Sequence, residues 1–507
     1  MKMARGLTWA LLLAAISAGV CGQEPPRASS NVYPAARPLQ TEVKEHKLAS
    51  SLERLVPKLM ADGDVPGLSM AVVRGGSIFW HKAFGVQIAG GNAPVGDDTI
   101  FEAASLSKPV FAYAVLKLVD QGRIDLDAPL SKYLPGDYVD DPRASGITAR
   151  RVLSHTTGLP NWRQGQPLKI FFAPGEKFSY SGEGFVYLQK AIERVTGRTL
   201  EDLMQGIVFE PLHMTSSSYV WQERFERRKA TGHDPAGGPQ KLQKPTEAIA
   251  AASLHTTALD YARFLIAVLD GTGLSPKTHA EMLRPQIRLD TSCSNCIDKK
   301  PGALSSELAW GLGWGLQEEA EEGRSLWHWG DNGGSGFHCY VVGYPRQKLG
   351  AVVFTNGLGG HGIIPDVIAA AIGGRQPAFA WLDYDRYDSP AKVFYKDVLA
   401  RGTAAVESYR AQKSAAAGHA LTEQQVNRIG YWLLARKKLK ESIAVFAMNA
   451  ADFSESWNVY DSLGEACAAD GQRQRAIESY EKSLSLNPAN TGGAEALRKL
   501  KSGPLPN

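Results

Sequence analysis

Strand-like segments occur in two groups that lie far apart in the sequence, and this arrangement most restricts the possible folds. The first group is a hairpin, in which residues 68–74 and 77–84 are joined by the two-residue turn Gly75-Gly76. The second group covers residues 308–316, 325–329, 337–344 and 349–355. Helical periods and long loops fill the sequence between the groups. We therefore expect an α/β (α+β) fold, with an antiparallel sheet built from both ends of one domain, flanking helices and an all-helical insertion.

The composition is that of a globular chain with a sizeable core. Of 507 residues, 44% are hydrophobic and 21% are charged, which excludes wholesale disorder. Lys and Arg together number 56 against 52 for Asp and Glu, and the net charge of +4 is too small to indicate a nucleic-acid partner.

The N-terminus is typical of a signal peptide covering residues 1–22. Lys2 and Arg5 precede an apolar stretch over residues 7–20, and small residues follow near Gly22. The stretch is too short to span a bilayer, and no later segment is long and apolar enough to be transmembrane. We expect an exported, soluble protein, either periplasmic or secreted, with a linker over residues 23–45. Lipid modification of Cys21 is an alternative that the bulky Val20 disfavours.

The remaining cysteines do not indicate a metal or redox site. Cys293 and Cys296 form a C-x-x-C string in a polar loop, without the βαβ context of a redox motif or the second ligand pair of a zinc site. In an oxidising compartment a local disulfide is the simpler interpretation. Cys339 and Cys467 are predicted to be isolated buried thiols.

The composition changes after about Gly374, and a 34-residue repeat follows further along the chain. Residues 423–456 and 457–490 are the two copies, with Gly430 aligned to Gly464 and Phe446 to Tyr480. A period of 34 is typical of tetratricopeptide (TPR) helical hairpins, and a plain helical extension is the alternative. We predict a main domain over residues 46–375, connector helices over 376–420 and TPR-like repeats over 421–500. Such a tail is able to bind a protein partner.

One S-x-x-K string, Ser105 to Lys108, lies in a sequence context that suits a serine nucleophile and a lysine base. Two others, starting at Ser389 and Ser479, lie in the connector and in a repeat helix. The first string precedes a helical run of apolar residues, namely Val110, Phe111, Ala114, Val115, Leu118 and Val119. Pro109 is tolerated only in the first turn of a helix, so Ser105 must lie at its front.

This position has consequences for reactivity. Residues three apart share a helix face, so Lys108 can reach the Ser105 hydroxyl. Burial near a helix N-terminus favours the neutral amine, which can act as a base. The Ser105 backbone N–H is free to bind an oxyanion. The alternative is a capping serine followed by a surface lysine, which the motif alone would favour.

Two further motifs follow in order. Tyr180 stands in the turn-rich loop of residues 172–182, and His328-Trp329-Gly330-Asp331 ends a predicted strand. With Ser105-x-x-Lys108, these resemble the S-x-x-K, Y-x-N and K/H-x-G motifs of class C β-lactamases, penicillin-binding proteins and related serine esterases. The resemblance extends over most of residues 46–375 and implies the β-lactamase/DD-peptidase type of fold.

The resemblance implies a role for each motif residue. Ser105 would attack a carbonyl carbon and become the acyl-enzyme, while Lys108 and Tyr180 would share the general-base work. Tyr180 would also relay protons to the leaving group and from the hydrolytic water. The N–H groups of Ser105 and Asp331 would form the oxyanion hole.

The same strand carries two further substrate-side residues by this resemblance. His328 takes the position where other members place a lysine that meets a substrate carboxylate, and Gly330 would keep the strand bare for substrate. Gly182 replaces the asparagine of Y-x-N. The glycine and the histidine at these two positions both weaken the case for a potent β-lactamase. We set His155 aside as structural, and the chemistry requires no metal and no cofactor.

We therefore predict an exported serine hydrolase that opens ester, amide or lactam bonds of a small-molecule or peptide substrate through an acyl-serine. Two alternatives remain. A β-lactamase proper would turn over cephalosporin-like substrates that simple esters would not match. A catalytically weak, penicillin-binding-like receptor would use the TPR-like tail to recruit a protein partner, and Gly182 keeps that alternative open.

Overall fold

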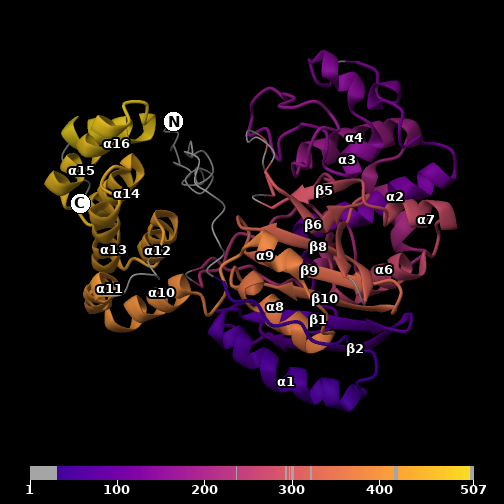
Figure 1. Cartoon of the computed structure of the whole chain (residues 1–507), viewed down its shortest axis with the longest axis horizontal. Helices are drawn as coiled ribbons and strands as arrows, with labels where there is room; N and C mark the ends of the chain where they lie inside the picture. The colour runs from indigo at the N-terminus through magenta and orange to yellow at the C-terminus, as the bar shows by residue number, and fades with distance from the viewer. Residues whose placement is uncertain are drawn as a thin grey trace, which may run out of the picture. The chain divides into compact units, whose positions relative to one another are not determined.

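The chain forms two compact units (Figure 1). The computed structural model describes residues 31–502 except 137, 236, 292, 293, 296, 298–301, 320, 321 and 416–420. The first unit comprises the residues up to Asp234 and Pro239–Tyr384, and the second comprises Pro235–Gly238 and the residues from Asp385 onward. The predicted signal peptide and the Cys293–Cys296 disulfide lie outside the described residues.

The first unit is built on an eight-stranded antiparallel sheet with the order β2-β1-β10-β9-β8-β7-β6-β5. The strands are β1 (Gly67–Arg74), β2 (Ser77–Gly85), β5 (Ile287–Asp290), β6 (Leu304–Trp310), β7 (Gly315–Glu319), β8 (Gly323–Asn332), β9 (Phe337–Tyr344) and β10 (Leu349–Thr355). β1 pairs with β10, so Leu68 lies opposite Thr355. The prediction of a sheet made from both ends of the domain is confirmed.

One predicted strand is wrong. Residues 308–316 do not form a single strand, because the chain reverses between β6 and β7, where the Gly311 N–H donates to the Trp314 carbonyl. Gly313 has a φ of +85°, and a Cβ on it would lie 2.3 Å from the Ala112 Cβ on α2 (Ser107–Asp120). A left-handed residue without a side chain therefore permits the turn, and this requirement comes from tertiary packing.

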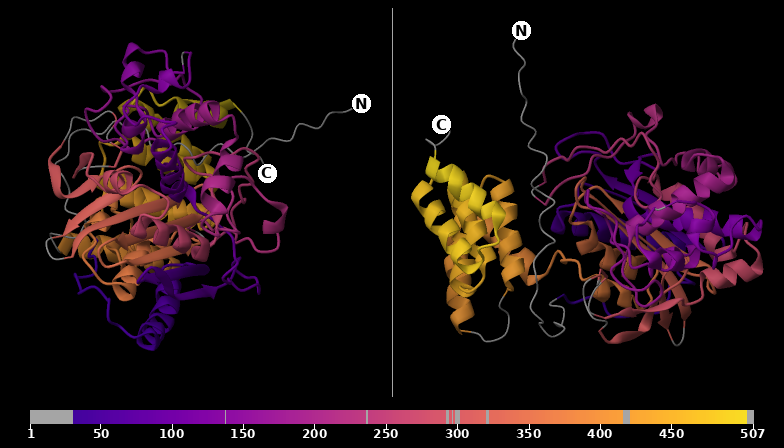
Figure 2. Two further views of the ribbon diagram at one scale, coloured as in Figure 1. Left: turned by 90° about the vertical axis from the view of Figure 1, so that its right-hand side faces the viewer. Right: turned by 90° about the horizontal axis from the view of Figure 1, so that it is seen from above.

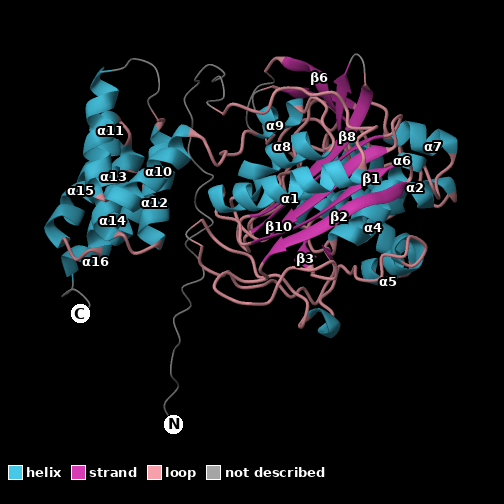
Figure 3. Ribbon diagram, turned by 90° about the horizontal axis from the view of Figure 1, so that it is seen from below, coloured by secondary structure: helices cyan, strands magenta, loops and turns pink. Residues whose placement is uncertain are grey.

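Helices cover both faces of the sheet, so the strands β1, β9 and β10 are buried along nearly their whole length, whereas the edge strand β2 is partly exposed. α1 (Glu45–Asp62) and α8 (Gly360–Ala371) pack together against one face, and α6 (Ala258–Asp270) lies against β1 and β10 on the other. Figure 3 distinguishes the magenta strands from the helices around them. The core on the α6 side includes Ala71, Val341 and Val352.

The polypeptide between the two groups of strands forms the helical insertion, which contains Ser105, Lys108 and Tyr180. Its α-helices are α2 (Ser107–Asp120), α3 (Ala149–Leu153), α4 (Gly182–Thr196), α5 (Leu200–Met204), α6 and α7 (Pro276–Met282), and β3 (Phe101–Glu102) pairs with β4 (His255–Thr256). Nearly every residue of α2 is buried, which confirms the expectation of a helix through the core. Ser105 lies just before this helix, in a single 3₁₀ turn formed by Ala104–Leu106.

The second unit is helical over its described residues (Figure 2). It contains α10 (Pro390–Arg401), α11 (Thr403–Ala415), α12 (Glu423–Ala435), α13 (Leu439–Asp452), α14 (Trp457–Ala469), α15 (Arg473–Leu486) and α16 (Thr491–Ser502). α9 (Pro377–Leu382) belongs to the first unit, which continues to Tyr384. The helical character of the tail agrees with prediction, and its assignment to TPR repeats stays a prediction.

The two sequence copies share a packing feature. A Cβ on Gly430 would lie 2.4 Å from the Phe446 ring, and one on Gly464 would lie 3.1 Å from the Tyr480 ring. Each glycine lets an aromatic side chain of the following helix approach the backbone, which explains why both copies keep this pair. Elsewhere, Cys339 and Cys467 are buried and free, as predicted. Among the described residues, no helix is long and apolar enough to cross a bilayer.

We expect Gly430→Ala to destabilise the α12–α13 pair by about 1–3 kcal/mol, because the new methyl group would overlap the Phe446 ring. Gly492→Ala is the matched control, since the nearest atom to its Cβ is 3.6 Å away. Hydrogen exchange measured by mass spectrometry on α12 and α13 peptides should be faster in Gly430→Ala alone. Equal exchange in the two variants would contradict this packing account.

Candidate active site

Ser105 and Lys108 meet at the start of α2, as the three-residue spacing predicts. The Lys108 Nζ donates to the Ser105 Oγ over 3.0 Å and to the Ala251 carbonyl over 2.7 Å. Lys108 is fully buried, whereas Ser105 is partly exposed. The amine is therefore shut off from solvent, while Ser105 keeps partial exposure.

Burial changes the acid–base properties of this lysine. Removing the ammonium group from water lowers the pKa of Lys108 from 10.5 to about 7. A large fraction of the side chain is then a neutral amine near pH 7, with a lone pair able to accept the Ser105 proton. The Nζ also lies 4.7 Å from the centroid of the Tyr180 ring.

The 3₁₀ turn that presents Ser105 is held from several sides. Ala104 has a φ of +47°, a left-handed conformation that costs free energy for a residue with a Cβ. The Ser107 hydroxyl donates to the Ala104 carbonyl over 2.6 Å. Two buried phenols complete the support, since Tyr219 donates to the Ser107 carbonyl and Tyr261 to the Leu106 carbonyl. These bonds keep the strained turn in place.

Tyr180 comes from the loop before α4 and lies beside Lys108. Burial raises the pKa of the Tyr180 phenol, and the nearby Ser105 side chain partly opposes this shift. The phenol is therefore protonated at neutral pH. Its oxygen makes no hydrogen bond of normal length and angle to any described residue, so its proton is available to a reacting group.

His155, which sequence reasoning set aside as structural, supports Tyr180 directly. The two rings stack with centroids 4.2 Å apart, and the Ser181 N–H donates to the His155 Nδ1 over 3.0 Å. Burial, and next the nearby Lys108, keep the pKa of His155 well below its usual value. A neutral, packed imidazole therefore holds the tyrosine loop. The spacing of the motifs does not reveal this contact.

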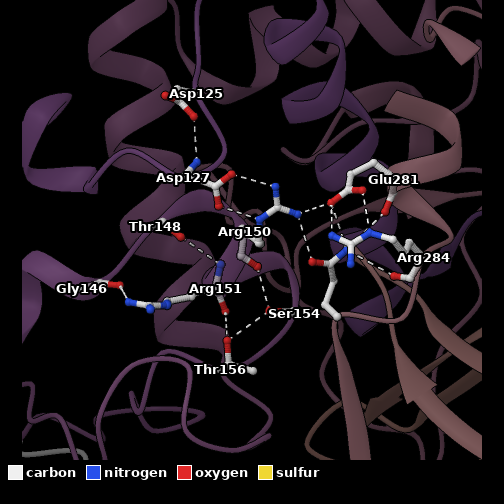
Figure 4. A network of polar contacts seen from close by, with 11 residues as sticks. Asp125, Asp127, Gly146, Thr148, Arg150, Arg151, Ser154, Thr156, Glu281 and Arg284 are labelled. Carbon is white, nitrogen blue, oxygen red and sulfur yellow. Dashed lines mark hydrogen bonds and ion pairs between the residues drawn. The ribbon is translucent and has the colours of Figure 1, made fainter. Parts of the chain in front are cut away.

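A polar network anchors the helix that precedes His155 (Figure 4). Arg150 on α3 donates to both carboxylate oxygens of Asp127, over 2.6 and 2.8 Å, and to Glu281 on α7. At the end of α3 the Ser154 hydroxyl donates to the Arg150 carbonyl over 2.8 Å. The network fixes α3 against its neighbours, and the chain then turns at His155 with a φ of +54°.

His328 on β8 is fully buried and neutral. Its Nδ1 donates to the Trp329 carbonyl over 2.8 Å, and its Nε2 has no partner among the described residues. Burial, and next the nearby Lys108, lower the pKa of His328 to about 3. This position therefore carries no positive charge at neutral pH.

Gly330 is required by packing against the turn that carries Ser105. A Cβ at this position would lie 2.2 Å from the Cys339 Sγ and 2.5 Å from the Ala103 carbonyl. Packing alone is therefore sufficient to explain this glycine, and access for substrate along the strand stays a prediction. The next residue, Asp331, lies with its carboxylate 3.3 Å from the His338 Nε2.

Gly182 occupies the position of the Y-x-N asparagine, and protein atoms fill the space beside it. A Cβ here would lie 2.9 Å from the Asn161 carbonyl and 3.0 Å from the Trp162 ring, whose side chain is 43% exposed. An exposed indole therefore lies directly beside Gly182. Within the described part of the chain, no group of three or more His, Cys, Asp or Glu residues is arranged to hold a metal ion.

Comparison with known proteins assigns this arrangement to a family, because the Beta-lactamase family model matches residues 52–371. The chain belongs to the β-lactamase family. Penicillin-binding protein 4 of Amycolatopsis lactamdurans is 29% identical over 329 residues, which cover 59% of this chain and 83% of the relative. D-alanyl-D-alanine-carboxypeptidase/endopeptidase AmpH of Escherichia coli K12 is 25% identical over 348 residues, 64% of this chain and 88% of the relative.

Esterase EstB of Burkholderia gladioli is 29% identical over 231 residues, which cover 39% of this chain and 58% of that esterase. The first unit also has the fold of solved family structures. D-alanine carboxypeptidase AmpC of Burkholderia cenocepacia gives a TM-score of 0.52 at 20% identity, covering 62% of this chain and 95% of that one. The octameric penicillin-binding protein homologue of Pyrococcus abyssi gives a TM-score of 0.53 at 22% identity. That match covers 69% of this chain and 81% of the homologue. The chain is thus a β-lactamase-fold member of a serine-hydrolase family.

The lowered pKa of Lys108 predicts how acylation of Ser105 depends on pH. Only the neutral amine can accept the Ser105 proton, so labelling by an uncharged phosphonate ester should slow about tenfold per pH unit below pH 7. Above that pH the rate should level off. Lys108→Arg, which stays protonated, should label at least about 100-fold more slowly at every pH. A flat profile in the wild-type chain would contradict the assignment of Lys108 as base.

Gly330→Ala should displace the turn that carries Ser105 and lower the labelling rate of Ser105 by at least about tenfold, because its methyl group overlaps the Ala103 carbonyl. Gly334→Ala is the control in the following loop, where a Cβ would meet no atom within 4 Å. The phosphonate labelling rates of the two variants check this. Full reactivity in folded Gly330→Ala would show that the packing is not essential.

Proposed function

We propose that this protein hydrolyses uncharged carboxylic esters through an acyl-serine intermediate on Ser105. The observation that carries the proposal is the 3.0 Å hydrogen bond between the Ser105 hydroxyl and a buried lysine whose pKa is lowered to about 7. A serine hydroxyl paired with a neutral amine is an activated nucleophile. The match to the β-lactamase family and to a relative named as an esterase supports this reaction class.

The proposed reaction has two halves. The Ser105 Oγ attacks the ester carbonyl carbon while its proton passes to the Lys108 Nζ, and the carbonyl oxygen becomes an oxyanion. The N–H groups of Ser105 and Asp331 stabilise this oxyanion, each donor contributing about 3–4 kcal/mol. Collapse of the intermediate expels the alcohol, which takes a proton through Tyr180. Water then attacks the carbonyl carbon of the acyl-serine, and its proton passes through Tyr180 to Lys108. The proton returns to the Ser105 oxygen as the acid is released.

The charge of the site supports esters rather than substrates that need a carboxylate partner. His328 is neutral because burial lowers its pKa to about 3, so it offers no ammonium group to a carboxylate. Gly182 supplies no carboxamide, and the exposed Trp162 ring beside it offers an apolar surface instead. These replacements favour binding of neutral, apolar acyl groups.

A D-peptidase or β-lactamase activity is the second candidate. Relatives named as a penicillin-binding protein and as a D-alanyl-D-alanine-carboxypeptidase/endopeptidase favour it.

We propose further that the protein is exported, on the strength of the N-terminal sequence of residues 1–22. The helical unit is proposed to bind a protein partner, as TPR-like repeats do.

Turnover of p-nitrophenyl esters and of a chromogenic cephalosporin tests the proposal. We expect ester kcat/KM to exceed that for the cephalosporin by at least about 100-fold, because the cephalosporin carboxylate finds no cation at His328. Ser105→Ala should abolish both ester turnover and covalent labelling by a phosphonate, measured by intact mass. Faster cephalosporin turnover would identify a β-lactamase, and labelling without turnover would favour the receptor alternative.

A further inference from the structure

Tyr384, the last residue of the first unit, is bonded to the strand that carries the H-x-G motif. Its hydroxyl donates to the Asp331 Oδ2 over 2.7 Å and accepts from the Trp329 Nε1 over 3.0 Å. These two residues flank Gly330 on β8. Tyr384 follows α9 and lies beyond residues 52–371, the part of the chain that the family model matches.

Two histidines join Tyr384 to the same point of the strand. The His361 ring stacks on Tyr384 with centroids 4.2 Å apart and on His338 with centroids 4.0 Å apart. The His361 Nε2 donates to the Gly330 carbonyl over 3.0 Å. The His361 backbone N–H donates to the His338 Nδ1, so the other nitrogen of His338 carries a proton and faces the Asp331 Oδ1 at 3.3 Å.

This cluster restrains the peptide bond between Gly330 and Asp331. In a trans peptide the carbonyl of one residue and the N–H of the next point in opposite directions. Because His361 holds the Gly330 carbonyl, it also sets the direction of the Asp331 N–H, which is the proposed oxyanion donor. The side chain of Asp331 is held at the same time, with one oxygen against His338 and the other against Tyr384.

The charge of Asp331 makes this restraint important. Burial disfavours the carboxylate, but His338, His361 and the Tyr384 hydroxyl outweigh it and hold the pKa of Asp331 below its usual value. Burial, and next the Asp331 charge, raise the pKa of Tyr384, so the proton stays on the phenol. A carboxylate close to a developing oxyanion would oppose it, and donors that bind and orient this carboxylate limit that cost.

We propose that Tyr384 is a positioning residue for ester hydrolysis: through Asp331 and Trp329 it orients the Gly330–Asp331 peptide, so that a segment beyond the family domain completes the active site. This inference rests on the proposed function. Tyr384 also fixes the Trp329 indole, whose ring lies 4.9 Å from that of Tyr180. It does not touch the substrate, and its effect is on the transition state because the oxyanion forms only there.

Tyr384→Phe in the full-length chain tests the proposal, because it keeps the ring stack and removes only the hydroxyl. We expect ester kcat and the phosphonate labelling rate to fall about tenfold with KM within about twofold, as for loss of a hydrogen bond to a charged group. Tyr133→Phe is the matched control, since its hydroxyl accepts from the Asp125 N–H instead, and it should keep wild-type rates. Circular dichroism and the unfolding temperature verify that each variant is folded.

A double-mutant cycle with Asp331→Asn distinguishes positioning from general stabilisation. If Tyr384 acts through the Asp331 carboxylate, adding Tyr384→Phe to Asp331→Asn should change kcat by less than about twofold. Additive losses, or a folded Tyr384→Phe chain with wild-type kcat, would overturn the positioning role while leaving the proposed function intact. Absence of Ser105-dependent labelling in the wild-type chain would overturn the proposed function, and the positioning role with it.

Discussion

Burial of the Lys108 amine against the Ser105 hydroxyl is the interaction on which the candidate site depends. It exists because α2 is apolar on nearly all sides and runs through the core, which leaves the lysine no path to solvent. The cost of burying an ammonium group appears as a lowered pKa, and the neutral amine that results is the reagent that the hydroxyl needs. The same burial that stabilises the domain thus supplies the proposed nucleophile with a neutral base.

The sheet and one loop bring the H-x-G segment and Tyr180 close to this amine. β8 is central in the strand order, and its H-x-G segment packs against the turn that carries Ser105, with Gly330 leaving room for the Ala103 carbonyl. Tyr180 arrives from a separate loop and is held by the His155 ring. Three distant parts of the sequence therefore meet at one place, and buried side chains behind them hold them there.

Periodic patterns made the sheet and the helix behind Ser105 predictable. The Gly75-Gly76 turn between two strand-like runs and an apolar helix with Pro109 in its first turn are local signals, so they can be read without knowledge of tertiary contacts. The turn between β6 and β7 was not predictable in this way, because Gly313 is required by Ala112 on another element. The roles of Ser105, Lys108 and Tyr180 stay predictions, to which the geometry adds proximity and charge state. The contacts of His155 and Tyr384 have no local signature, since each arises from packing between distant segments.

The end of the first unit also indicates where this protein can be divided. A fragment that stops at residue 371, the end of the family match, would lack α9 and Tyr384. It would lose the Trp381 indole, which donates to the Asp290 carbonyl over 2.7 Å and meets the Trp327 ring edge to face, with centroids 5.8 Å apart. Transplanting the hydrolase into a fusion protein, or pairing it with a different tail, therefore calls for a junction after Tyr384 rather than at the limit of sequence similarity.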